Sequence, residues 1–234
     1  MSAVPETTMY VGQNSNGFEV KDVTPLDALR SVAYQLEHKQ SGARLLHLYN
    51  QDAENLFSVS FPTPPPDDTG IPHILEHAVL AGSGKYPVKE PFFEMIKMSM
   101  ATFINAMTGS DCTYYPVASN VKQDLFNLAE VYFDAVFHPL LTEQTFRREG
   151  HHFAPSDPEN PTGDLTITGI VYNEMKGAFS DPESRLYRSI SRELLPDTIY
   201  GKESGGDPEA IPDLTYEALK EFHSTYYHPS NSYF

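Results

Sequence analysis

The chain has 234 residues, of which 32 are acidic and 16 basic, so its formal net charge is −16 at pH 7. This length fits one large domain, and an apolar content of 40% can bury a sizeable core, which excludes a wholly disordered chain. The acidic balance argues against a nucleic-acid-binding protein and is compatible with basic partners such as cationic peptides.

The remaining composition favours a soluble protein of a reducing compartment. Cys112 is the only cysteine, so no intrachain disulfide is expected. No apolar run approaches the roughly 18–20 residues that span a bilayer, and we expect no membrane partner. The segment 1–6 has neither the basic region of a secretion signal nor an arginine-rich transit pattern. We therefore expect a cytoplasmic protein, with an organelle matrix as the alternative if a transit peptide is absent from this chain.

After a polar lead-in, three short segments rich in valine, leucine, tyrosine and phenylalanine predict strands. Short turn-like links separate them, so neighbouring strands should pair antiparallel. The proline-rich segment 63–70 cannot continue a sheet and predicts a loop. The three predicted strands are Ser31–His38, Ala43–Tyr49 and Leu56–Phe61.

Helices and a hairpin are expected next. Pro72 suits the first turn of a helix that runs to about Ala81, and a second short helix is predicted at Pro91–Met98. Two segments, Thr102–Thr108 and Thr113–Ala118, resemble the strands of a hairpin with its turn at 109–111.

The second half of the sequence is mainly helical. Apolar residues at spacings of three and four from Val121 to Val136 predict a helix that covers a sheet. Thr142 and Asp181 are suitable N-caps for two of the later helices. We expect an α+β fold with a mostly antiparallel sheet covered by helices on one face. The other predicted elements are helices at 142–150, 169–179, 182–195 and 215–227, a strand at 164–168, and loops at 155–163 and 202–213.

The pentapeptide His73-Ile74-Leu75-Glu76-His77 carries the chemistry of this sequence. Two histidines four residues apart on a helix project from one face and can share a cation. Glu76 leans toward the same face, so two nitrogen ligands lie beside a carboxylate that can act as a general base. An ordinary helix with two solvated histidines is the alternative, but the apolar neighbours make it less favourable. We expect Zn²⁺, with one ion per chain.

A catalytic zinc usually takes three protein ligands, and the third must come from elsewhere in this chain. Glu174 falls on the predicted buried face of its helix, where a carboxylate is costly unless it is paired or bound to metal. Glu149 lies beside Arg147 and Arg148 and resembles a surface residue. The candidates are His138, His151, His152, Glu143, Glu149 and Glu174.

The pentapeptide, followed by Gly-Ile-Val-Tyr-Asn-Glu-Met-Lys-Gly at 169–177, resembles the insulinase (pitrilysin) family of zinc peptidases. The likeness is greatest to its presequence-protease subgroup, because the gap between His77 and Glu174 is longer than in insulysin and processing-peptidase relatives. It extends from about Arg44 to Phe234 and includes the segments 103–108 and 227–231. The resemblance implies an insulinase-like or processing-peptidase-like metallohydrolase domain.

By this resemblance His73, His77 and Glu174 would be zinc ligands, and Glu76 the base that activates water for attack on a peptide carbonyl. Asn105 and the backbone of Ala106 would bind substrate as an added strand. An ordinary hairpin strand is the alternative for this segment. The expected substrates are unfolded oligopeptides, with a preference for basic ones.

The resemblance also implies a longer protein. Full-length relatives have two similar halves that enclose a chamber, and the second half helps to hold substrate. Asn231–Phe234 resembles the start of a strand, so we expect residues 1–234 to be one N-terminal domain that stops before its last strand and helix. The remaining domains would be its partners, and the isolated chain would be weakly active or inactive.

Two other functions remain open. One is a catalytically silent scaffold domain of peptidase shape, although the intact pentapeptide and Glu174 favour an enzyme. The other is a zinc hydrolase that acts on small molecules, which would need a site too closed for a peptide strand.

Overall fold

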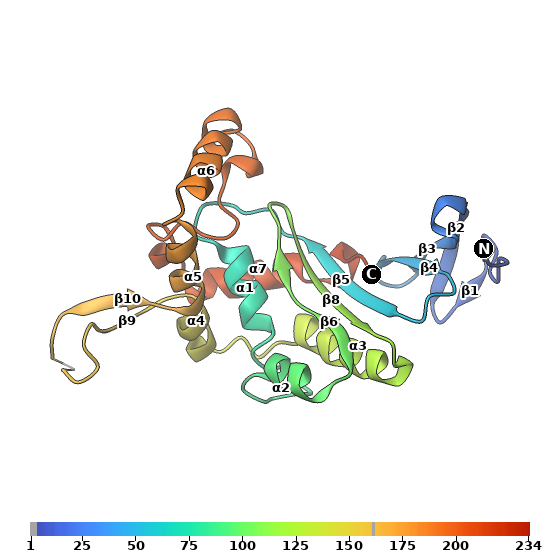
Figure 1. The fold of residues 1–234 in the computed structure, drawn as a ribbon, viewed down its shortest axis with the longest axis horizontal. Helices are drawn as coiled ribbons and strands as arrows, with labels where there is room; N and C mark the ends of the chain where they lie inside the picture. Colours follow the sequence, from blue (N-terminus) through green and yellow to red (C-terminus); the bar gives the residue numbers. More distant parts are fainter. Residues whose placement is uncertain (1–3, 161) are drawn as a thin grey trace.

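A mostly antiparallel sheet runs through the computed structural model, which describes residues 4–160 and 162–234 (Figure 1). Its strands form two groups of four, ordered β1-β2-β3-β4 and β5-β8-β6, and β7 also pairs with β8. Helices pack against the second group. The expected α+β architecture is therefore confirmed. The strands of the first group are β1 (Asn14–Ser15), β2 (Phe18–Leu26), β3 (Ser31–His38) and β4 (Arg44–Tyr49).

The residues before Ser31 include the nine-residue strand β2, so the prediction of a polar lead-in there is wrong. Two features hide this strand in the sequence. Its register with β3 shifts between Val20 and Asp22, which interrupts the alternation of buried and exposed side chains, and it contains Pro25. Val20 nevertheless lies in a small buried cluster with residues of β3.

The second group of strands carries the helices. Two of its predicted strands are confirmed to within two residues, but the predicted strand Thr102–Thr108 is interrupted at Asn105 and Ala106. The register with β8 shifts between Ala101 and Phe103 and is then kept from Phe103 to Thr108, on both sides of the interruption. The strands of this group are β5 (Asn55–Pro62), β6 (Ala101–Ile104), β7 (Met107–Thr108) and β8 (Cys112–Ser119).

Residues 232–234 lie between β4 and β5 and join the two groups. The amide of Tyr233 donates to the Ser60 carbonyl at 2.9 Å and its carbonyl accepts from the Ser60 amide at 2.9 Å. On the other side, the amide of Phe234 donates to the Arg44 carbonyl at 2.8 Å. These residues are extended and pair with strands, as their sequence predicts.

Seven helices are present in the described part of the chain, and all of the predicted ones are among them. The predicted apolar stripe of α3 is buried, with Leu128, Tyr132 and Val136 almost inaccessible. The hydroxyl of Thr142 and the carboxylate of Asp181 accept N–H bonds from the first turns of their helices, as predicted. The helices are α1 (Ile71–Val79), α2 (Pro91–Met98), α3 (Lys122–Phe137), α4 (Glu143–Glu149), α5 (Ile170–Ala178), α6 (Pro182–Leu194) and α7 (Tyr216–Tyr226).

Helix α1 lies at the centre of this arrangement, in contact with β7, β8, α4 and α7 (Figure 1). Ile74, Leu75 and Val79 are fully buried in the main core. By contrast, α6 and the hairpin of β9 (His152–Pro155) and β10 (Leu165–Thr168) extend away from the core (Figure 1). None of the described helices is long and apolar enough to cross a bilayer.

Candidate metal centre

The two histidines of α1 lie one turn apart and have adjacent rings. The helix begins after Gly70, whose φ of +69° suits glycine, and Pro72 occupies its first turn. The ring centroids of His73 and His77 are 5.0 Å apart. Glu76, between them in sequence, is only 6% exposed. The geometry of α1 therefore brings the polar side chains of the pentapeptide close together.

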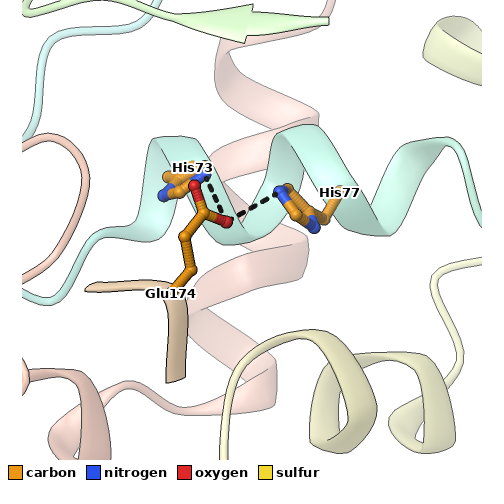
Figure 2. A group of neighbouring side chains, drawn as sticks. All are labelled: His73, His77 and Glu174. Carbon is orange, nitrogen blue, oxygen red and sulfur yellow. Dashed lines mark ion pairs between the residues drawn. The ribbon is translucent and has the colours of Figure 1, made fainter. Parts of the chain in front are cut away.

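Glu174 approaches both rings from α5 (Figure 2). Its Oε2 atom lies 3.8 Å from Nε2 of His73 and 3.9 Å from Nε2 of His77. One ligand atom from each of these three residues lies within 4.8 Å of the other two. The structure thus brings together a carboxylate and two histidines that are far apart in the sequence.

Glu174 lies on an exposed side of α5, so the prediction that it belongs to the buried face of this helix is wrong. Its side chain is 54% exposed. Val171 and Met175 are buried as expected, but Ile170 is 46% exposed. The apolar face of α5 is narrower than predicted, because Ile170 and Glu174 border an open cleft rather than the core.

Each histidine ring is oriented by a second contact. Nδ1 of His73 lies 3.0 Å from the carbonyl oxygen of Gly205, and Nδ1 of His77 lies 3.3 Å from Oε2 of Glu149. If Nδ1 carries the proton in both rings, each donates to an oxygen and leaves the lone pair of Nε2 toward Glu174.

Glu149 is not the surface residue that the sequence suggests. It is 6% exposed and accepts a hydrogen bond from Nε of Arg148 at 2.8 Å as well as the contact with His77. Burial raises the pKa of this carboxyl, but the hydrogen bonds from His77 and Arg148 outweigh it and lower the pKa. Glu149 is thus an ionised group beside a ring of the metal centre.

His77 responds to the same surroundings. Burial lowers the pKa of its ring, but the hydrogen bond to Glu149 and the charges of Glu76, Glu149 and Glu174 raise it by more. The net result is a raised pKa. A cation, whether a proton or a metal, is therefore favoured at this position.

Glu76 lines the same cleft as the two histidines and lies near three buried tyrosines. Its Oε2 accepts a hydrogen bond of 2.6 Å from the hydroxyl of Thr108. Burial and the nearby Glu76 charge raise the pKa of Tyr115, Tyr132 and Tyr227, so the phenols stay protonated.

The other candidate ligands have partners away from this centre. His138 contacts Asp134, and Glu143 pairs with Arg147. His151 and His152 contact the backbone carbonyls of Leu214 and Arg147, respectively.

A cleft of about 620 Å³ opens in front of the histidines. Asn105 and Ala106, the predicted substrate-binding residues, line it together with the metal-centre residues. Part of its wall is apolar, formed by Leu80, Phe92 and Phe93 among others. The cleft thus joins the polar cluster of His73, His77 and Glu174 to an apolar surface, as sites for peptides or small molecules commonly do.

Comparison with known proteins identifies the family. The model of "Insulinase (Peptidase family M16)" matches residues 63–155, which contain the pentapeptide and Glu149. The mitochondrial presequence protease of Xenopus laevis is 51% identical over 95% of this chain. The chain belongs to the insulinase family.

Other insulinase-family proteins agree with this assignment. Presequence protease 1 of Arabidopsis thaliana, named chloroplastic/mitochondrial, is 49% identical over 92% of the chain. The crystal structure of pitrilysin matches 99% of the chain with a TM-score of 0.66 at 21% identity, which shows a shared fold. The chain spans only 20–22% of the length of these proteins.

Peptidases of the insulinase family are metallopeptidases, so a metal is implied here. The residues present fit that requirement. Two imidazole nitrogens and one carboxylate oxygen form a donor set used by catalytic zinc sites, and partners at both Nδ1 atoms are what metal-binding histidines usually have.

Proposed function

We propose that this chain is the metal-bearing domain of a zinc-dependent endopeptidase that degrades unfolded oligopeptides. The observation that carries the proposal is the convergence of His73, His77 and Glu174 beside Glu76 at the cleft. A site for small molecules would be more enclosed. The alternative of a silent scaffold gains no support, because all four groups of the reaction centre are intact.

His73, His77 and Glu174 would hold one Zn²⁺ per chain. When bound, the ion supplies a Lewis acid that polarises a carbonyl and makes water more acidic. The three side chains occupy only part of a zinc coordination sphere and leave room on the cleft side for water or substrate.

Glu76 would act as the general base and then the general acid. Its carboxylate accepts a proton from the water that attacks the peptide carbonyl, and later donates this proton to the departing amine. Its place at the cleft beside His73 and His77 supports this role.

Asn105 and Ala106 would bind the substrate backbone. They follow β6, the outer strand of its group, and line the cleft. The amide of Asn105 donates to the Pro116 carbonyl at 3.2 Å, and its carbonyl accepts from the Tyr132 hydroxyl at 3.1 Å. A segment fixed in this way can receive an extended peptide by strand addition, which reads backbone rather than sequence.

Partners and compartment follow from the relatives. Because the chain spans about a fifth of their length, we expect further domains of a longer polypeptide to be its partners. Relatives named mitochondrial or chloroplastic favour an organelle matrix over the cytoplasm expected from the sequence. No nucleic acid or membrane is needed for the proposed activity.

The decisive experiment replaces the proposed base and a proposed ligand in the native polypeptide that carries this chain. Glu76→Gln should retain zinc, measured by elemental analysis, but lose about 10²–10⁴-fold in kcat on an unfolded peptide. His73→Ala should lose the zinc itself. The matched control is His138→Ala, because His138 is an exposed histidine away from the cleft.

Two results would contradict the proposal. One is a wild-type protein that binds zinc but cleaves no peptide, which would support the scaffold. The other is a Glu76→Gln variant that retains full turnover.

A further inference from the structure

We propose that Thr108 is a positioning residue that fixes the Glu76 carboxylate so that Oε1 alone is available as the base. This inference rests on the proposed peptidase function. Its starting point is the hydrogen bond from the Thr108 hydroxyl to Oε2 of Glu76, 2.6 Å long, between residues 32 positions apart.

The contact has the properties of a strong, orienting interaction. Its length lies within the range of about 2.5–2.7 Å typical of a hydroxyl that donates to an ionised carboxylate. Glu76 makes no other side-chain hydrogen bond within residues 4–160 and 162–234. Tilting the carboxylate away from this partner would leave the Thr108 hydroxyl unpaired, and a half-turn only exchanges the two equivalent oxygens, so one oxygen always faces Thr108.

Thr108 is itself held in place by the sheet. It lies opposite Thr113 in the pairing of β7 with β8. Thr113 is fully buried, and its hydroxyl lies 2.7 Å from that of Thr63. Strand β7 also contacts α1, the helix that carries Glu76. The sheet thus positions the Thr108 hydroxyl, and this hydroxyl positions the Glu76 carboxylate.

The nearby tyrosines cannot replace Thr108. The hydroxyls of Tyr115 and Tyr227 lie 2.7 Å apart and bond to each other. The hydroxyl of Tyr132 donates to the Asn105 carbonyl. None of these three phenols is hydrogen-bonded to Glu76 within residues 4–160 and 162–234. In the described part of the chain, the Thr108 hydroxyl is the group that determines which Glu76 oxygen remains free.

Three substitutions in the zinc-loaded native polypeptide test this role. Thr108→Val keeps the shape but removes the hydroxyl, so kcat should fall about 10–100-fold while KM and zinc content stay close to wild type. Thr108→Ser keeps the hydroxyl and should retain kcat within about threefold of wild type. Thr166→Val is the control, because it removes a threonine hydroxyl from an exposed position of β10, a strand away from the cleft.

A structural readout accompanies the kinetics. In a crystal structure of the Thr108→Val variant, the Glu76 carboxylate should occupy more than one orientation. In the Thr108→Ser structure it should keep the wild-type one, with the serine hydroxyl within hydrogen-bond distance of Oε2.

Each result with the Thr108 variants either supports or overturns the proposed role of the hydroxyl. Wild-type kcat in Thr108→Val would overturn the inference, as would a Thr108→Ser variant as slow as Thr108→Val. If Thr108→Val fails to fold or loses zinc, the serine variant decides: near-wild-type kcat supports the role of the hydroxyl, and a large loss overturns it. A wild-type protein without peptidase activity would instead refute the proposed function.

Discussion

The two histidines of α1 each use one ring nitrogen within the protein and present the other to Glu174. Their partners differ: a backbone carbonyl at Gly205 for His73, and the ionised carboxylate of Glu149 for His77. A carboxylate makes an imidazole more basic than a carbonyl does, so the ligand strength of His77 should depend on Glu149.

Replacing Glu149 by glutamine should therefore weaken zinc binding. The amide keeps an acceptor near Nδ1 of His77 but removes the negative charge. We expect the dissociation constant for zinc to rise by about 10–100-fold, measured by competition with a chelator. Glu143→Gln is the control, since it changes an exposed carboxylate on the same helix that pairs with Arg147. Equal effects of the two substitutions would contradict the role of Glu149.

The burial of Glu149, unlike the grouping of the pentapeptide residues, could not be predicted from the sequence. His73, Glu76 and His77 could be recognised because helix geometry relates them locally. Glu149 contacts a histidine 72 positions away, and its arginine neighbours suggested a solvated position. Its environment depends on the packing of α4 against α1, which no local pattern encodes.

Among the structural elements, the start of α1 and the loop 203–206 depend on each other. A side chain at Gly70 would place its Cβ 2.5 Å from the Cα of Gly206, so the two backbones touch. The amide of Asp207 also donates to the Asp68 carbonyl at 2.8 Å. This close approach delivers the Gly205 carbonyl to the ring of His73.

Gly70→Ala should disturb this approach. Backbone strain at positive φ costs about 1–3 kcal/mol of unfolding free energy, and the clash with Gly206 should add to that and weaken zinc binding. Gly42→Ala is a matched control: its φ is +72°, but no atom lies within 4 Å of the new Cβ. Denaturant unfolding and zinc titration of both variants measure the difference. Equal losses would show that the backbone contact is unimportant.

Helices and strands with a clear pattern of apolar residues could be predicted from the sequence. Strands that pair irregularly with their neighbours could not. The apolar stripe of α3 and the strand-favouring residues of β3 predicted their elements almost to the residue. Strand β2 was missed because a register shift interrupts its alternation. The break at Asn105 and Ala106 was also missed; the register with β8 is the same on both sides of it.

For the whole molecule, the length of the relatives sets the expectation for activity. The chain spans about a fifth of their length, and the other parts of such proteins could supply substrate contacts. We expect the 234-residue chain alone to bind about one zinc but to cleave peptides weakly or not at all. The comparison of its kcat/KM with that of the native polypeptide measures this. Robust cleavage by the isolated chain would contradict it.

The net charge of −16 leads to a separate expectation for substrate choice. An acidic surface should speed the approach of basic peptides, and salt should screen this attraction. The ratio of kcat/KM between a basic and an acidic peptide should fall by about threefold or more when ionic strength rises from about 0.01 to 0.5 M. A ratio that does not change with salt would count against electrostatic steering.

The proposed zinc ligands and the groups that contact them come from α1, α4, α5 and the loop 203–206, four regions that meet only after folding. A nascent chain in which α5 has not yet docked offers the ion the two imidazoles of α1 without the carboxylate of Glu174. Tight zinc binding should then follow the docking of α5 rather than precede it. Bound zinc would in turn stabilise the packing of these four regions against one another. Chelation should consequently speed amide hydrogen exchange in α5 before it loosens the distant strands β2 and β3.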